Sequence, residues 1–290
     1  MPELPEVETV VRGLQVLLPG RRISAIRLGK TDFIDDPVLL EETLPGSQIL
    51  SVHRHGKFIV VHLTKPTLPS AKAPSESQLS IFHFIVHLGM TGQLIVLPPS
   101  APSALHTHVW LSLDNEKELR FVDPRRFGRM LVLPETHSES VLSPLGIDPL
   151  HASTQEFHQR LAAKRARIKA VLLDQRVFRG MGNIYTDESL WRARIHPTRL
   201  AANLTQKEIA RLYRAVQTIL REAIRLGGSS ISDYVNAEGQ PGEFQIRHRA
   251  YGREGKKCSR CGSLIRRITV AGRSSYFCPK CQRAPRPRRK

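Results

Sequence analysis

The chain has 290 residues, 40% of them hydrophobic, so it is long enough for two domains with separate cores and is not a disordered protein. Its formal net charge of +18 favours a polyanionic partner, of which nucleic acid is the commonest. No apolar run approaches the roughly 18 residues of a membrane span, and no signal-peptide core stands at the N-terminus. We therefore expect a soluble cytoplasmic protein with no membrane partner. We also expect a monomer.

The chain opens Met-Pro-Glu-Leu-Pro-Glu-Val-Glu, and this stretch supports two interpretations. Because Pro2 is small, we expect Met1 to be removed, which leaves a secondary amine that can attack a sugar carbon and form an iminium. An α-amino group is less basic than a lysine, and Glu3 and Glu6 place carboxylates for acid–base catalysis beside it. The structural interpretation is a helix over residues 3–18, since proline and acidic residues favour a helix N-terminus.

The residues that follow this helix predict strands. β-Branched and aromatic residues separated by turn signals mark strands at 22–28, 49–63, 80–88, 93–97, 108–113, 119–122 and 129–133. Strands this numerous with short connections indicate a β-sandwich or a barrel. Residues 65–78, rich in proline and serine, are expected to form an exposed loop.

Beyond residue 150 the apolar periodicity predicts helices over 154–174, 184–193 and 205–226. The first of them has a basic face that comprises Lys164, Arg165, Arg167 and Lys169. Between the first two helices lies Gly180-Met-Gly-Asn183, where two glycines and a following helix N-terminus could hold a DNA phosphate. The same residues are also compatible with an ordinary interhelical turn.

All four cysteines lie in two Cys-x-x-Cys pairs, Cys258/Cys261 and Cys278/Cys281. In an intracellular chain such clustering favours metal over disulfides, and four thiolates at this spacing make a closed tetrahedral site for one structural Zn²⁺. A redox pair or incidental buried cysteines are the alternative. The intervening residues 264–277 alternate as a β-hairpin does, so we expect zinc to fix a hairpin with Arg273 at its tip.

Two turns in the β region carry residues suited to distorting DNA. DPRRFG (123–128) offers arginines beside Phe127, and HLGMTG (87–92) offers Met90. Proteins that extrude a base fill the gap with an apolar wedge and a neighbouring cation. Core packing is the alternative for both side chains. Lys57 could contact phosphate or transfer a proton, or be merely solvated.

Five motifs match one family in order along the chain. PELPEVE at the N-terminus, HLGMTG, DPRRFG, GMGNIYTDE (180–188) and the four-cysteine finger together closely resemble the bacterial formamidopyrimidine-DNA glycosylases. The resemblance implies an α+β fold and a bacterial cytoplasmic protein associated with the nucleoid through DNA. Its implied parts are an N-terminal β-sandwich catalytic domain (2–132), a hinge (133–149), a helix–two-turn–helix DNA-binding domain (150–250), a zinc finger (251–282) and a basic tail (283–290).

The resemblance also implies a base excision repair enzyme, a bifunctional DNA glycosylase and abasic-site lyase. It would flip out and excise oxidised purines such as 8-oxoguanine and formamidopyrimidines from double-stranded DNA, then cleave the abasic strand by β,δ-elimination. In this resemblance Pro2 is the nucleophile that attacks the deoxyribose C1′, and Glu3 is the acid that assists opening of the sugar ring. Lys57 is a proton donor that contacts phosphate in β-elimination, and Arg273 is a phosphate ligand in δ-elimination. The implied DNA contacts are the residues that fill the void of the flipped nucleotide, Met90, Arg125 and Phe127, together with His106, Lys164 and Asn183.

Two alternatives stay open. An endonuclease VIII-like glycosylase for oxidised pyrimidines would share the fold, although PELPEVE and DPRRFG favour the purine branch. A noncatalytic zinc-finger DNA-binding protein would share the charge and the finger, but it leaves the proline amine and the wedge unexplained. The family's lesion-capping loop is matched only loosely by residues 227–247, so the resemblance does not imply a ranking of lesions.

Overall fold

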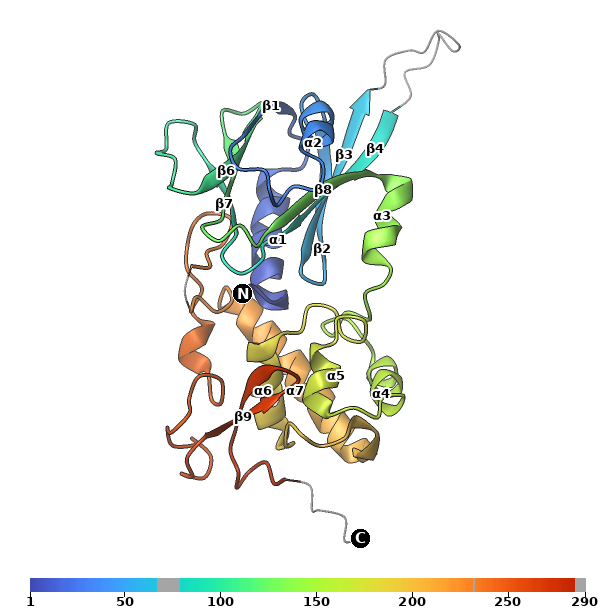
Figure 1. Cartoon of the computed structure of the whole chain (residues 1–290), viewed down its shortest axis with the longest axis vertical. Coiled ribbons are helices and arrows are strands. Elements are labelled where there is room, and N and C mark those ends of the chain that lie inside the picture. The colour runs from blue at the N-terminus through green and yellow to red at the C-terminus, as the bar shows by residue number, and fades with distance from the viewer. Residues whose placement is uncertain (67–78, 232, 285–290) are drawn as a thin grey trace. The chain divides into compact units, whose positions relative to one another are not determined.

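The computed structural model describes residues 1–66, 79–231 and 233–284, which form two compact units (Figure 1). The first unit contains residues 1–2, 6–144 and 227–242, and the second contains residues 3–5, 145–226 and the chain from 243 onward. The expected loop at 65–78 lies, from residue 67 on, outside the described residues, as does the expected tail from residue 285.

The first unit is the expected β-sandwich. Its strands are β1 (Ile23–Leu28), β2 (Gln48–His55), β3 (Phe58–Pro66), β4 (Leu79–His87), β5 (Gln93–Leu97), β6 (Thr107–Leu113), β7 (Glu118–Val122) and β8 (Arg129–Pro134). One antiparallel sheet has the order β1-β6-β7-β5 and the other β2-β3-β4-β8. Apolar side chains from both sheets form one core, and α1 (Leu4–Leu17) adds Val7, Val10 and Leu14 to it. The core forms because alternate residues of each strand point to the same face.

The segment expected to be a single strand over 49–63 is two strands. His55 pairs with Phe58, which leaves Gly56 and Lys57 as a two-residue hairpin turn. Gly56 has φ 62°, and glycine at the first central position is typical of a type II′ turn. The β-branched residues on both sides predict strand equally well, so only this glycine could have marked the turn.

Two short helices of the first unit were not expected from the sequence. The side chain of Asp36 accepts a hydrogen bond from Leu39 N–H (2.9 Å) at the start of α2 (Pro37–Thr43), and proline occupies the first helical position. The second is α3 (Glu135–Leu142), which falls in the expected hinge and contacts β4 and β8. Local capping signals were therefore present for α2, whereas α3 has no side-chain cap.

The second unit is helical and carries a hairpin. Its helices are α4 (Thr154–Ala162), α5 (Ile168–Leu173), α6 (Asn183–Ala193) and α7 (Gln206–Arg225), with 3₁₀ turns η1 (Ala201–Asn203) and η2 (Phe244–Arg247) and strands β9 (Arg266–Val270) and β10 (Arg273–Phe277). Thr205 and Glu208 form the capping box expected for α7. No helix among the described residues is long and apolar enough to cross a membrane.

The expectation of one helix over 154–174 is wrong. Residues between α4 and α5 pair instead with a segment that is remote in sequence: Ala166 C=O accepts from Ala201 N–H (2.9 Å), and Ile168 N–H donates to Arg199 C=O (2.7 Å). These tertiary hydrogen bonds override the local helical periodicity. As a consequence Lys169 lies on the buried side of α5 with 0% exposure, and it is not part of a basic surface.

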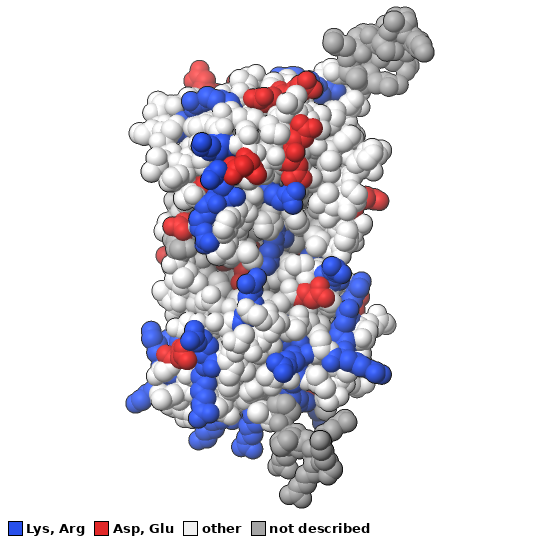
Figure 2. All heavy atoms as spheres, in the orientation of Figure 1, with Lys and Arg blue, Asp and Glu red and all other residues white. Residues whose placement is uncertain are grey.

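Charge is distributed differently over the surfaces of the two units (Figure 2). In the view shown, acidic and basic side chains are interspersed over the sandwich, where Arg126 pairs with Asp32 (2.7 Å) and Arg129 with Asp35 (2.8 Å). Over the second unit, in the same view, basic side chains predominate. On the face shown, a polyanion is therefore attracted more strongly to the second unit than to the sandwich.

Candidate functional site

The candidate nucleophile and the candidate acid are consecutive residues at the start of the chain. Pro2 is buried, and Glu3 is 3% exposed. The Glu3 carboxylate accepts hydrogen bonds from the backbone N–H groups of Ile184 (2.9 Å) and Tyr185 (3.3 Å). A carboxylate is well suited to the unpaired N–H groups and positive dipole end of a helix N-terminus. The start of α6 therefore orients the carboxylate of Glu3.

Gly180 and Gly182 make room for this contact. A Cβ at Gly182 would lie 2.2 Å from Glu3 Cδ, and one at Gly180, where φ is 90°, would lie 2.8 Å from Leu4 Cβ. Leu4 N–H also donates to Gly180 C=O (2.9 Å). The N–H groups of Ile184 and Tyr185 are therefore not available to a phosphate, and the space beside the two glycines is filled by Glu3 and Leu4. Asn183, the first residue of α6, stays a predicted DNA contact.

Glu6 anchors the segment 227–242 to α1 within the first unit. Its carboxylate accepts from Ser229 N–H (2.7 Å), and its backbone C=O accepts from the hydroxyl of Tyr234 (3.1 Å). Val96 N–H, in β5, donates to Ala237 C=O (2.9 Å) in the same segment. The sequence contains no spacing signal for this long-range contact. The region that resembles a lesion-capping loop is thus tied to the helix that begins next to Pro2.

Asp123 joins the two turns that carry the candidate wedge. Its carboxylate is fully buried and accepts from the hydroxyl of Thr91 (2.5 Å) and from Gly128 N–H (2.8 Å). Gly89, with φ 60°, leaves no room for a side chain, because a Cβ there would lie 2.3 Å from the backbone of Phe127. The segments 87–92 and 123–128 are therefore held against each other.

The joined turns expose apolar side chains beside a cation. Met90 is 40% exposed and Phe127 is 53% exposed, so neither packs in the core. The guanidinium of Arg125 lies over the Phe127 ring, 4.4 Å from its centroid, which is a cation–π contact. His106, exposed and with φ 69°, is tied to the same turn because its C=O accepts from Asp123 N–H (3.0 Å). This arrangement suits a wedge against a base stack.

Lys57 lies beside a histidine that supports the first of these turns. The lysine is 9% exposed in the β2–β3 turn. The nearby His87 accepts a hydrogen bond at Nδ1 from Gly89 N–H (3.1 Å), so this nitrogen carries no proton. Burial, and then the charge of Lys57, lower the pKa of His87 to about 4. The neutral imidazole thereby links the end of β4 to the segment that bears Met90.

Acid should weaken this link. The pKa of His87 in the folded chain is about 4, below the usual 6.5, so its stabilising effect is complete above about pH 6.5 and is lost as pH falls toward 4. The shift corresponds to at most roughly 3.5 kcal/mol of unfolding free energy. Urea unfolding at pH 7.5 and 4.5 should show a smaller loss for His87→Gln than for the wild type. Acid also releases zinc, but this lowers the stability of both proteins alike and cancels in the comparison. Equal losses of stability in His87→Gln and the wild type would therefore refute the stabilising role of neutral His87.

The four cysteines fit one zinc ion. Their sulfur atoms all lie within 4.8 Å of one another, and Cys261 Sγ is 3.4 Å from Cys278 Sγ. Tetrahedral zinc with bonds near 2.3 Å places sulfurs about 3.8 Å apart, which is close to this geometry. The β9–β10 turn has positive φ at Ala271 (52°) and Gly272 (68°), as a type I′ turn requires. Arg273 follows the turn as the exposed first residue of β10.

A buried ion pair docks the hairpin on the helices of the second unit. Lys169 Nζ lies 2.7 Å from Asp187 Oδ1 and donates to Ser274 C=O (2.7 Å), and Asp187 Oδ2 accepts from Tyr276 N–H (2.9 Å). Burial lowers the pKa of Lys169 and raises that of Asp187 to about 7, because neither charge is solvated. Arg273 is therefore positioned by two polar groups of α5 and α6 as well as by zinc.

Removal of one partner of this pair should loosen the hairpin. Lys169→Met leaves Asp187 buried without its cation, and breaking a buried pair costs about 3–5 kcal/mol. Hydrogen exchange over 273–277 and thermal unfolding measure the effect. The double variant Lys169→Met/Asp187→Leu should recover part of the loss, because no uncompensated charge is then buried. A single variant as stable as the wild type would contradict the pair's role.

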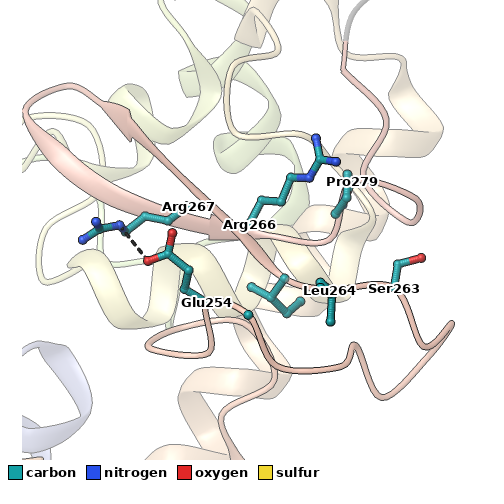
Figure 3. A pocket seen from close by; sticks show the side chains of 8 residues that line it. Glu254, Ser263, Leu264, Arg266, Arg267 and Pro279 are labelled. Carbon is teal, nitrogen blue, oxygen red and sulfur yellow. Dashed lines mark ion pairs between the residues drawn. The ribbon is translucent and has the colours of Figure 1, made fainter.

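A hollow on the zinc-binding module lies apart from these groups (Figure 3). Its lining residues are Glu254, Gly255, Ser263, Leu264, Ile265, Arg266, Arg267 and Pro279. Arg267 pairs with Glu254 (3.0 Å) at one side of the hollow. None of the candidate catalytic residues lines it, so the hollow has no assigned part in the chemistry.

Comparison with known proteins matches almost the whole chain. The Formamidopyrimidine-DNA glycosylase N-terminal domain matches residues 1–130, the H2TH domain of the same proteins matches 145–235, and the zinc finger found in FPG and IleRS matches 255–284. A formamidopyrimidine-DNA glycosylase of Pelotomaculum thermopropionicum is 43% identical, covering 98% of this chain and 99% of that relative. The chain belongs to the formamidopyrimidine-DNA glycosylase family.

Other members of the family agree in sequence and in structure. The formamidopyrimidine-DNA glycosylase of Bacillus cereus is 38% identical, with coverage of 97% and 99%. The Lactococcus lactis enzyme in complex with DNA containing an abasic site has a TM-score of 0.84 at 33% identity, covering 97% of this chain and all of that one. A variant of that enzyme with DNA containing Fapy-dG also has a TM-score of 0.84 at 33% identity, covering 98% and 100%. The chain is thus a DNA glycosylase by family.

Proposed function

We propose that this glycosylase excises oxidised purines, including 8-oxoguanine and formamidopyrimidines, from duplex DNA and then cleaves the abasic strand. The observation that carries the proposal is the N-terminal Pro-Glu pair, in which the carboxylate of Glu3 is held by the start of α6. The complexes of the Lactococcus lactis relative with DNA containing Fapy-dG and with abasic DNA support the lesion class and the second step.

The proposed reaction begins at the amine of Pro2 after Met1 has been removed. The nitrogen attacks C1′ of the damaged nucleotide, the bond from C1′ to the base breaks, and the base leaves with a proton. Glu3 assists the opening of the sugar ring by giving a proton to the ring oxygen, which leaves an iminium between Pro2 and C1′. Loss of a C2′ proton then expels the 3′-phosphate, and a second elimination expels the 5′-phosphate. Hydrolysis of the iminium frees the enzyme.

The phosphates need cations while these bonds break. We assign Lys57, next to His87, to phosphate contact and proton donation in the first elimination. Arg273 is assigned to phosphate in the second, on the hairpin that bound zinc keeps folded. The exposed guanidinium on a short hairpin suits bidentate phosphate binding.

The remaining candidate residues would hold the distorted duplex. Met90 and Phe127 fill the space that the flipped nucleotide leaves, with Arg125 beside them, since unstacking costs a few kcal/mol that such contacts offset. His106, Lys164 and Asn183 are assigned to the DNA backbone. Lys164 is exposed in the turn between α4 and α5, and its own C=O accepts from Ala202 N–H (3.1 Å), which fixes the turn.

A second substrate class has one observation in its favour. The Lactococcus lactis enzyme has also been solved with DNA containing an oxidised pyrimidine. Borohydride trapping across duplexes that carry 8-oxoguanine, a formamidopyrimidine, thymine glycol or no lesion separates the alternatives. We expect strongest trapping with the purine lesions. Preferential trapping with thymine glycol would favour the endonuclease VIII-like activity, and tight binding without trapping or cleavage would favour a noncatalytic DNA-binding protein.

A further inference from the structure

The outer face of α7 carries a row of cations that the proposed reaction does not use. We define the α7 stripe as Lys207, Arg211, Arg214, Arg221 and Arg225, all of which are exposed. Their spacing of three, four or seven residues places them on one side of the helix, along about 27 Å at a rise of 1.5 Å per residue. Thr218 occupies the remaining exposed position of this side.

The acidic residues of α7 do not neutralise the stripe. Glu208 pairs with Arg199 (3.1 Å), and Glu222 pairs with Arg192 (3.5 Å). Within the part of the chain that the structure describes, no cation of the stripe has a carboxylate oxygen within 4.0 Å. Both acidic residues of α7 therefore form ion pairs with arginines outside the stripe. The positive charge of the stripe itself is not neutralised by them.

Such a stripe is unfavourable for the helix by itself. Like charges three or four residues apart repel, and helix surfaces that are only solvated ordinarily mix both signs. Arg211 Nε and Arg214 Nε donate to backbone carbonyls, those of Ala193 and Ala210, and these contacts orient the two side chains without removing their charge. A row of cations along one side of a helix suits a rigid polyanion with regularly spaced charges.

The stripe is separate from the proposed lesion-binding residues of its unit. The apolar face of α7, which includes Leu212, Val216 and Ile219, is buried and packs with α6, whereas the stripe lies on the exposed side of α7. Lys164 belongs to the α4–α5 turn, and Asn183 begins α6. Duplex DNA carries one charge per about 1.7 Å of its axis, which matches an extended row of cations better than a small anion does.

We propose that the α7 stripe is a second DNA-binding surface that takes a segment of undamaged duplex while the lesion is held elsewhere on the protein. The attraction is electrostatic and independent of sequence, because lysine and arginine side chains neutralise phosphates, which carry no sequence information. It would retain the enzyme on long DNA and permit transfer between neighbouring segments. The test uses the covalent adduct of the proposed function, so the proposal rests on that function.

In the first step of the experiment, a short lesion duplex is bound covalently at the lesion-binding residues. The full-length protein is trapped with borohydride on a short lesion duplex, the adduct is purified, and binding of a second, labelled, undamaged duplex is measured against salt. Failure to trap would count against the proposed function. A trapped adduct that binds no second duplex would overturn the stripe proposal alone.

A triple variant identifies the surface. Lys207→Gln/Arg214→Gln/Arg221→Gln should weaken binding of the second duplex about tenfold or more at low salt, and reduce the slope of log K against log salt by about 2–3, since each phosphate contact contributes about 0.9. Cleavage of the short lesion duplex should be unchanged, which also shows that the variant is folded.

The matched control removes three exposed cations of the sandwich, Arg21→Gln/Lys30→Gln/Lys117→Gln. It should bind the second duplex as the wild-type adduct does. Equal weakening in the stripe variant and the control would overturn the proposal, because the effect would then reflect net charge alone. Stripe-dependent binding of the adduct to anionic lipid vesicles, with no stripe-dependent binding of duplex, would overturn it in favour of a membrane surface.

Discussion

A residue that blocks the amine of Pro2 should abolish borohydride trapping and lower strand cleavage at an oxidised purine by at least about 10³-fold, the scale expected when a nucleophile is lost. The simplest such protein retains a residue in front of Pro2, which turns the amine into an amide without a nucleophilic lone pair. Pro2→Gly, which keeps a primary amine but loses the ring, should also lose trapping. Mass spectrometry of the mature N-terminus establishes which form is present, and gel analysis of the borohydride-treated lesion duplex measures the adduct.

The control for this prediction is binding. Met90, Arg125 and Phe127 belong to turns that do not depend on the N-terminal amine, so the blocked protein should still bind the lesion duplex with near wild-type affinity. Loss of both binding and trapping would indicate a misfolded start of α1. Full trapping by the blocked protein would transfer the role of nucleophile to another amine, such as that of Lys57, and would refute the assignment.

The sequence predicted most of the strands because their signals are local, whereas the choice of a sandwich over a barrel came from the family resemblance. β-Branched runs and their turn residues report the strands directly, and Thr205 with Glu208 reports the start of α7. The expectation failed where tertiary pairing decides the outcome. The break between α4 and α5 depends on hydrogen bonds to residues 199–201, which are 31 to 35 positions away and which no local pattern records.

The same distinction holds for the candidate site. Motif matching predicted Pro2 and Glu3 as catalytic residues and the four cysteines as zinc ligands, and the sulfur positions fit the zinc site. It could not show that the glycines at 180 and 182 make room for Leu4 and Glu3, because that depends on a contact across almost 180 residues. Lys169 was misassigned for a related reason. A lysine at a helical spacing predicts a solvated face, and only the opposing Asp187 makes its burial favourable.

The loss of one zinc ligand should remove the second elimination before it affects the fold of the sandwich. Cys278 is fully buried and belongs to the small apolar cluster that includes Trp191 and Ile265. In Cys278→Ser the site keeps three thiolates, and zinc affinity should fall steeply, since structural zinc contributes about 10–16 kcal/mol in isolated fingers. The hairpin buries too few apolar side chains to fold on its own, so Arg273 should lose its fixed position.

Arg273→Gln distinguishes the role of the arginine side chain from that of the zinc ion that holds its hairpin. This variant should keep one zinc per chain by elemental analysis and stop the reaction after the first elimination, so the 3′-phosphate is expelled and the 5′-phosphate stays attached to the sugar fragment. Cys278→Ser should give the same product, but with loss of zinc and weaker DNA binding. Hydrogen exchange over 266–277 should also become rapid, because the contacts of Lys169 and Asp187 to β10 cannot hold an unfolded hairpin. A zinc-free Cys278→Ser protein that completes both eliminations at the wild-type rate would show that zinc is unnecessary for placing Arg273. If instead Arg273→Gln completes both steps, the phosphate ligand for the second elimination must be another cation.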